Sequence, residues 1–188
     1  MGMTPEQFFE SFVEGNSDDC HAMPGDIRRA FNAAVAASHL ADHYFAFNKR
    51  HNPSVVAAFP SIGPFVEHLS NKTGGAFRDI RSISNAYKHL YTNIDPKMEV
   101  YSSVNSTGAI ESINLPGDDD LISISEEYSG NTAAEEDKYK VVFTRKDGTT
   151  SEFLPILTTF VDYWRTAFYQ GAYSSFPCRG GNGFDFSN

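Results

Sequence analysis

Apolar residues recur at helical spacing through the first half of the chain. Residues 4–7, Thr-Pro-Glu-Gln, have the composition of a helix start, in which Thr caps, Pro suits the first position and Gln completes a capping box. An apolar stripe over residues 8–13 predicts that this helix continues to Gly15-Asn16, where we expect it to end. Residues 17–25 contain Asp, Pro and Gly and are interpreted as a connector.

The longest segment with helical spacing runs from Asp26 to Arg50 and is rich in alanine. It is followed by Asn52-Pro53, a sequence that ends a helix. Its apolar residues cover so wide an arc that the helix is expected to be packed from two sides and to lie centrally in the fold. The remaining polar strip consists of Arg28, Asn32, His39, His43 and Arg50.

Residues 77–92, FRDIRSISNAYKHLYT, predict the best-sorted amphipathic helix of the chain. Ahead of it we expect two short helices within residues 53–72, a break at 60–64, and a chain reset at Thr73-Gly74-Gly75. At about 100° per residue, the apolar side of this helix collects Phe77, Ile80, Ile83, Tyr87, Leu90 and Ile94. The opposite side collects Arg78, Arg81, Asn85, His89 and Thr92.

After Asp95-Pro96 the apolar residues alternate, as they do in β-strands. Residues 146–149, Lys-Asp-Gly-Thr, are a strong hairpin signal, and two acidic loops, 116–120 and 126–137, are interpreted as flexible and solubilising. Helical spacing returns over residues 154–169, with Leu157, Phe160, Val161, Trp164 and Phe168 as the buried edge. The expected strands start at Met98 and then lie at residues 110–115, 121–124, 139–143 and 150–153.

These patterns predict a predominantly helical α+β fold, with a bundle of about four to five helices and a small antiparallel β meander inserted before the last helix. We expect one domain overall. Its parts are a helical bundle in 1–95, the β insertion in 96–153, a final helix in 154–172 that packs back on the bundle, and a loosely ordered tail in 173–188.

The composition is that of a folded domain: 188 residues, 40% of them hydrophobic and 14% aromatic, are enough for one core. No apolar run approaches 18 residues, and no basic start precedes an apolar segment. We therefore expect no membrane span and no secretion signal, and assign the protein to the cytoplasm. In that compartment Cys20 and Cys178 are expected to be free thiols, with a disulfide between them as the alternative.

The net charge of −9 disfavours non-specific binding to nucleic acid or to an anionic membrane surface. The charge is unevenly distributed, because residues 26–88 contain eight Lys or Arg but four Asp or Glu. A mildly basic helical block is therefore joined to a strongly acidic remainder.

The polar side of the 77–92 helix is the strongest candidate for a functional site. Arg81, Asn85 and His89 follow one another at four-residue spacing, so their side chains can meet one ligand or one partner. An exposed face selected for solubility usually carries Glu and Lys, whereas this one carries Arg, Asn and His and a single acid, Asp79. The alternative is a solvated face whose basic groups are favoured by the helix C-terminus.

His39 and His43 have the four-residue spacing of a helical metal pair. The glutamate that follows the first His in HExxH is absent, since Leu40 follows His39. We therefore assign no metal and no cofactor, and expect a solvated or interhelical polar pair, in which His43 can pair with Asp42 or with the polar side of the 77–92 helix. The ligand-binding candidates are Arg78, Lys88, His43 and His39.

A helical bundle with Arg, Asn and His on one inner helix resembles the HEPN superfamily, whose members include RNA-cleaving toxins and nucleotide-binding modules. The signature is an Arg followed after about four to six residues by a His; here seven residues separate Arg81 from His89. The resemblance implies a metal-independent endoribonuclease in which His89 is the acid/base, Arg81 stabilises the phosphorane charge and Asn85 orients the phosphate. It also implies a homodimer.

The other hypothesis is a non-enzymatic binding or interaction module, in which the polar side of the 77–92 helix contacts a protein partner or a small ligand. The sequence favours this hypothesis, because the Arg-to-His spacing departs from the HEPN signature and the net charge opposes RNA binding. RNA is a partner only under the enzymatic alternative. An open groove at the polar side would indicate ligand binding, whereas full burial would indicate a packing network.

Overall fold

The computed structural model describes residues 2–89, 102–114 and 139–170, and the structural statements below concern these residues. The helices are α1 (Pro5–Phe8), α2 (Gly15–Ala22), α3 (Ile27–His51), α4 (Ile62–Lys72), α5 (Ala76–His89) and α7 (Phe153–Arg165). A π-helical segment, Phe9–Glu14, joins α1 to α2, a second, Thr166–Gln170, continues α7, and a 3-10 turn, Pro53–Val56, follows α3. The predicted class, α+β and predominantly helical, is confirmed.

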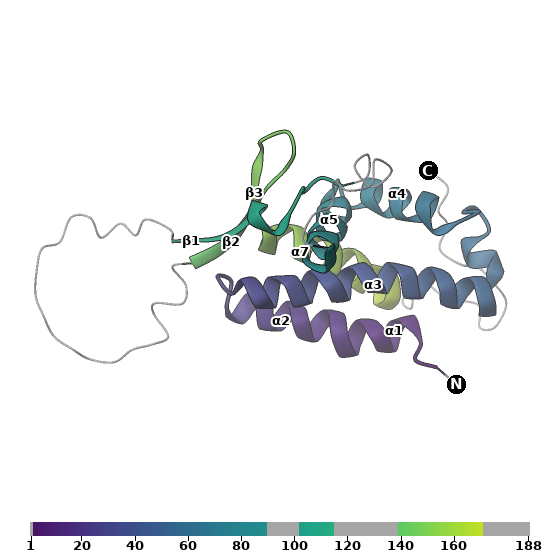
Figure 1. The fold of residues 1–188 in the computed structure, drawn as a ribbon. Helices are drawn as coiled ribbons and strands as arrows, with labels where there is room; N and C mark the ends of the chain where they lie inside the picture. Colours follow the sequence, from purple (N-terminus) through teal and green to yellow (C-terminus); the bar gives the residue numbers. More distant parts are fainter. Residues whose placement is uncertain (1, 90–101, 115–138, 171–188) are drawn as a thin grey trace, which may run out of the picture.

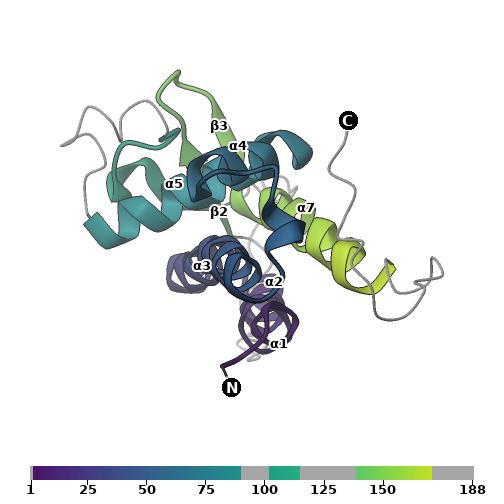
Figure 2. The same ribbon diagram turned by 90° about the vertical axis from the view of Figure 1, so that its right-hand side faces the viewer.

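Helix α3 lies at the centre of the helical layers. Viewed along this helix in Figure 2, α1 and α2 lie on one side of it, and α4, α5 and α7 lie on the other. Asp26 caps its N-terminus by accepting hydrogen bonds from the backbone N–H groups of Arg28 and Arg29. Because apolar residues around most of α3 are buried, including Ala34, Ala37 and Leu40 at 0% exposure, the predicted central position is confirmed.

Aromatic rings join the helices across the core. Phe77 of α5 stacks on Phe160 of α7 with ring centroids 5.0 Å apart, and Tyr44 of α3 contacts Trp164 of α7 with centroids 4.8 Å apart. All four side chains are buried. Burial of such large apolar surfaces is the main stabilising contribution in a core of this kind, and it packs α7 against both α5 and α3.

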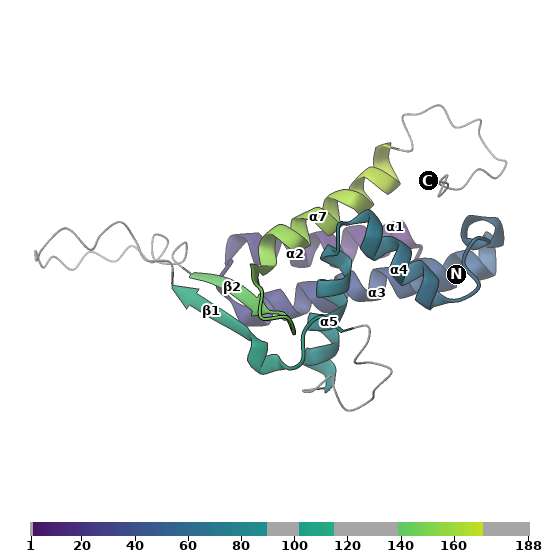
Figure 3. The same cartoon turned by 90° about the horizontal axis from the view of Figure 1, so that it is seen from above.

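Three strands, β1 (Ile110–Asn114), β2 (Tyr139–Thr144) and β3 (Thr150–Glu152), form an antiparallel sheet in that order. The sheet lies at the end of the bundle where α2 leads into α3 (Figures 1 and 3). There the Val141 N–H donates to the carbonyl of Pro24 at 3.0 Å, and Phe143 is fully buried. The predicted hairpin between β2 and β3 is confirmed, and Gly148 adopts the φ of +86° that its turn requires.

The N-terminal helix is longer than the sequence predicted. The capping box of Thr4 and Gln7 is present, but the expected end at Gly15-Asn16 is wrong, because helix continues to Ala22 and replaces most of the predicted connector. Gly15 has a right-handed helical φ of −59°. Ser17 and Cys20 are buried where α2 packs on α3 and α7, so tertiary packing outweighs the local glycine signal.

Smaller differences occur elsewhere. Helix α4 begins at Ile62, inside the predicted break, and tolerates Pro64 because the first turn of a helix needs no N–H donor there. The strand expected from Met98 is absent over its described part: the Ser103 N–H instead donates to the Ser82 hydroxyl of α5 at 2.8 Å. Outside the described residues lie 90–101, the strand expected at 121–124, both acidic loops, the tail and Cys178.

Within residues 2–89, 102–114 and 139–170, none of the helices combines the length and apolar character that crossing a bilayer requires.

Candidate functional site

Helix α5 is buried around most of its circumference. Phe77, Ile80 and Ile83 are buried as predicted, but Tyr87, predicted on the same apolar side, is 49% exposed and stacks on Phe31 of α3. The buried arc is wider than expected, since it also includes Asp79, Ser82, Ser84 and Ala86. The polar side keeps a narrow band of exposed or half-buried residues, which we call the α5 strip: Arg78, Arg81, Asn85 and Lys88.

Two members of the strip face α3. The Nη1 atom of Arg81 lies 3.2 Å from Oδ1 of Asp42, and Nζ of Lys88 lies 2.8 Å from Nε2 of His39. The structure therefore brings together three residues that the sequence singled out separately, Arg81, Lys88 and His39. Asp42, predicted as a partner for His43, completes the group instead by pairing with Arg81.

The short distance between Lys88 and His39 is compatible with one arrangement of protons when Lys88 is an ammonium. An ammonium can only donate, so Nε2 of His39 accepts and the imidazole is neutral with its proton on Nδ1. Partial burial of the ring, followed by the Lys88 charge, lowers the pKa of His39 below its ordinary value. Burial also lowers the pKa of Lys88. The nearby charge of Asp42 raises this pKa, and the charge of Arg81 lowers it further.

The other candidates have separate surroundings. Nε2 of His43 lies 2.9 Å from the carbonyl oxygen of Met3, and its ring packs on Phe8, so His43 fixes the N-terminus rather than sharing a site with His39. No cluster of three or more His, Cys, Asp or Glu side chains in the described parts of the chain could hold a metal. Asn85 is half-buried on the strip, and His89 is the last residue of α5, with its side chain outside the described set.

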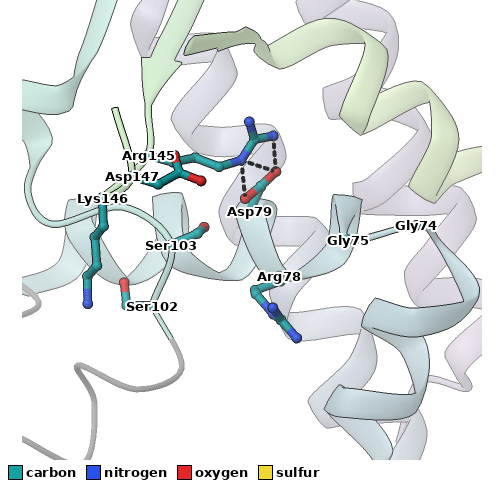
Figure 4. Close-up of a pocket in the computed structure, with 9 residues that line it drawn as sticks. All are labelled: Gly74, Gly75, Arg78, Asp79, Ser102, Ser103, Arg145, Lys146 and Asp147. Carbon is teal, nitrogen blue, oxygen red and sulfur yellow. Dashed lines mark hydrogen bonds and ion pairs between the residues drawn. The ribbon is translucent and has the colours of Figure 1, made fainter. Parts of the chain in front are cut away.

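A pocket of about 360 Å³ lies at the other end of the strip (Figure 4). Of the strip residues, Arg78 lines it, whereas Arg81, Asn85 and Lys88 do not. The candidates therefore occupy two places on one helix, a face shared with α3 and a pocket beside the β2–β3 hairpin. The pocket walls are Gly74, Gly75, Arg78, Asp79, Ser102, Ser103, Arg145, Lys146 and Asp147.

A buried ion pair forms one wall of this pocket. Nε of Arg145 lies 3.1 Å from each carboxylate oxygen of Asp79, and Nη2 lies 2.6 Å from Oδ2. Nη1 donates to Thr149 and Ser151 at 3.2 and 2.7 Å. The hydrogen bond to Asp79 raises the pKa of Arg145, and the pair ties the β2–β3 hairpin to α5.

The sequence placed Asp79 on the exposed side of the helix, and this was wrong, because Asp79 is only 5% exposed. A signal was available: at about 100° per residue, Asp79 falls between Ala86 and Ile83, inside the apolar arc. A carboxylate at such a position requires a buried cation. Arg145 is 66 residues away in the chain, so no local pattern could identify it as that cation.

Comparison with known proteins adds no relative. No protein-family model matches the chain, and it matches neither a curated protein nor a solved structure. The HEPN resemblance accordingly stays a prediction.

Proposed function

We propose that this protein is a non-enzymatic binding module that recognises a short acidic segment of a partner protein through the α5 strip. The observation that carries the proposal is the local charge of the strip and its α3 neighbours. Arg78, Arg81 and Lys88 supply three positive charges against the single carboxylate of Asp42, in a protein whose net charge is −9. A positive patch on a negative protein favours a localised acidic ligand.

The strip is held in place for such a contact. Asp42 and His39 of α3 engage Arg81 and Lys88, which restricts the rotamers of both long side chains before a partner arrives. One N–H of Arg81 donates to Asp42, and its other donors make no hydrogen bond within the described residues. A half-buried guanidinium with unused donors is well suited to a carboxylate.

The same charges argue against a long nucleic acid as the ligand. Binding of RNA requires an extended positive surface, because the phosphate backbone dominates the affinity. Here the positive groups form a short strip, and the rest of the chain would repel a polyanion. We place the module in the cytoplasm, as its sequence predicts.

The test is fluorescence anisotropy with a labelled Glu-rich peptide at low ionic strength, where screening is weak. The double variant Arg81→Glu/Lys88→Glu should bind at least roughly tenfold more weakly, equivalent to about 1.4 kcal/mol. Lys49→Glu/Arg50→Glu, in the last turn of α3, makes the same charge change away from the strip and should bind like the wild type. Equal losses of affinity in both double variants would show that only the net charge of the protein matters, and this would contradict the proposal.

The HEPN alternative is tested in parallel. It requires Arg81 and His89 to act on RNA, although in the structure Arg81 is paired with Asp42. A single-stranded RNA is incubated with the wild type, with Arg81→Ala and with His89→Ala in the presence of EDTA. Metal-independent cleavage that both substitutions abolish, with circular dichroism unchanged and a dimer in light scattering, would replace the binding module by the ribonuclease.

A further inference from the structure

The pocket at the N-terminal end of the α5 strip has features that a protein-contact surface does not need. We propose that it binds a small organic anion, whose acidic group pairs with Arg78 and whose body lies against Ser103 and the Gly74-Gly75 turn. The inference shares Arg78 with the proposed function, where this residue adds to the local positive charge, but the peptide test changes Arg81 and Lys88, neither of which lines the pocket.

The pocket's buried acid does not repel an anion. Asp79 is held by Arg145 through two nitrogens, and the remaining nitrogen of Arg145 is used by Thr149 and Ser151. Figure 4 shows the pair lying together on one side of the pocket. The pair is therefore electrically balanced and forms a rigid wall.

The second acid of the pocket is directed into the hairpin. Oδ1 of Asp147 accepts hydrogen bonds from the hydroxyl and the backbone N–H of Thr149 at 2.7 and 2.9 Å. These two hydrogen bonds lower the pKa of Asp147, and the bond from the hydroxyl contributes more than the bond from the backbone. The ionisable side chains in the lining are three cations, Arg78, Arg145 and Lys146, and two carboxylates, Asp79 and Asp147.

Arg78 is the cation with unused hydrogen-bonding capacity. It is exposed, and its guanidinium makes no hydrogen bond or ion pair within the described residues. In Figure 4 its side chain extends away from the Asp79–Arg145 pair. A free guanidinium at the edge of a pocket can bind a carboxylate or phosphate through two parallel hydrogen bonds.

A hydroxyl in the pocket wall also lacks a partner. The backbone of Ser103 is fixed on both sides, since its N–H donates to Ser82 and its carbonyl accepts from the Lys146 N–H. Its Oγ is shielded from solvent and has no hydrogen-bond partner among the described residues. A shielded hydroxyl without a partner is costly, and rotation of the Ser103 side chain towards the pocket would let a polar ligand atom satisfy it.

The remaining wall, the Gly74-Gly75 turn, allows a ligand to approach the backbone closely. Gly74 and Gly75 have φ values of +60° and +93°, and a side-chain carbon placed on either would meet open space. Their own N–H groups already bond to Asn71 and Ser70, so this wall supplies room rather than donors. A volume of about 360 Å³ exceeds that of a single inorganic ion and lies within the range of small-molecule sites.

The experiment compares each of two anions with a neutral compound that lacks its acidic group. Glutarate and glutaramide form the carboxylate pair, and glycerol 3-phosphate and glycerol form the phosphate pair. Each is titrated into the ¹⁵N-labelled full chain at constant ionic strength. We expect saturable amide shifts at Gly74, Gly75 and Ser103 with at least one anion and none with the neutral compounds, and the responding anion assigns the acidic group.

Arg78→Gln should weaken the binding roughly tenfold, as expected for the loss of a charge-assisted contact. Arg50→Gln is the matched control and should bind like the wild type. Because the Arg78 side chain has no described partner, the variant should keep the thermal midpoint of the wild type. Three results would overturn the proposal: neither anion gives saturable shifts, a neutral compound binds as tightly as its anion, or Arg78→Gln binds as tightly as Arg50→Gln. None of these results bears on the peptide experiment.

Discussion

Two ion pairs on α5 have the same chemistry and similarly exposed arginines, but their carboxylates differ greatly in burial. Asp79 pairs with Arg145 at 2.6 Å, with side chains 7% and 25% exposed, whereas Arg81 pairs with Asp42 at 3.2 Å, with side chains 27% and 44% exposed. The two α5 residues are two positions apart. The first pair joins the sheet to the helical bundle and is held by two further groups of the hairpin, Thr149 and Ser151. The second joins the strip to α3.

The difference shows that burial separates the charged residues of α5 that stabilise the fold from those that remain accessible to a ligand. A buried charge must be paired, because an uncompensated one costs several kcal/mol, so Asp79 and Arg145 are committed to the fold. An exposed pair contributes little to stability because water and salt screen it. Arg81 can therefore exchange Asp42 for a partner's carboxylate without unfolding the protein.

The largest expected effect comes from removing one half of the buried pair. Arg145→Ala should lower the free energy of unfolding by about 3 kcal/mol or more, because it leaves the Asp79 carboxylate buried without its cation. Urea denaturation measures the loss. The double variant Asp79→Ala/Arg145→Ala should lose less than the sum of the single changes, and strict additivity would contradict the assignment.

The next effect concerns the hydroxyl that joins residue 103 to α5. The Ser82 hydroxyl donates to the Arg78 carbonyl and accepts from the Ser103 N–H. Ser82→Ala should therefore cost about 1–3 kcal/mol, since it leaves that N–H unpaired. Ser84 is the matched control: its hydroxyl is equally buried but has no described partner, so Ser84→Ala should leave the thermal midpoint unchanged or raise it.

The exposed pair should give a much smaller change. Arg81→Ala is expected to lower the free energy of unfolding by about 0.2–1 kcal/mol, and added salt should shrink the difference further. The same denaturation series measures it. A loss as large as that of Arg145→Ala would mean that Arg81 holds the fold together, and the contrast between the two pairs would disappear.

The smallest effect is one of pH. Because the folded pKa of His39 is below its ordinary 6.5, the unfolded chain binds this proton more tightly. The contribution of neutral His39 to stability is therefore fully present above about pH 6.5 and is lost as the pH falls through that value towards the folded pKa. His39→Gln should flatten this part of the stability profile, and an unchanged slope between neutral and mildly acidic pH would contradict the lowered pKa of His39.

Much of the fold could be predicted from local patterns. The capping box at Thr4, the long alanine-rich helix and the Asp147-Gly148 hairpin depend on residues close together in the sequence, so their signals were sufficient. The end expected at Gly15 failed because α2 is held by packing on α3 and α7. For the site, the order of polar residues on α5 could be predicted, but not their partners.

The sequence by itself determined that Arg78, Arg81 and Asn85 share a side of α5, because helical spacing alone places them together; it did not assign Lys88 to that side. Only the tertiary structure decided what each of them faces. It turned Arg81 and Lys88 to Asp42 and His39 of α3, and placed Arg78 at a pocket beside a hairpin that follows much later in the chain. The physical reason is distance along the chain: periodicity acts within a few residues, whereas an ion pair such as Asp79–Arg145 forms only when packing brings residues 66 positions apart into contact.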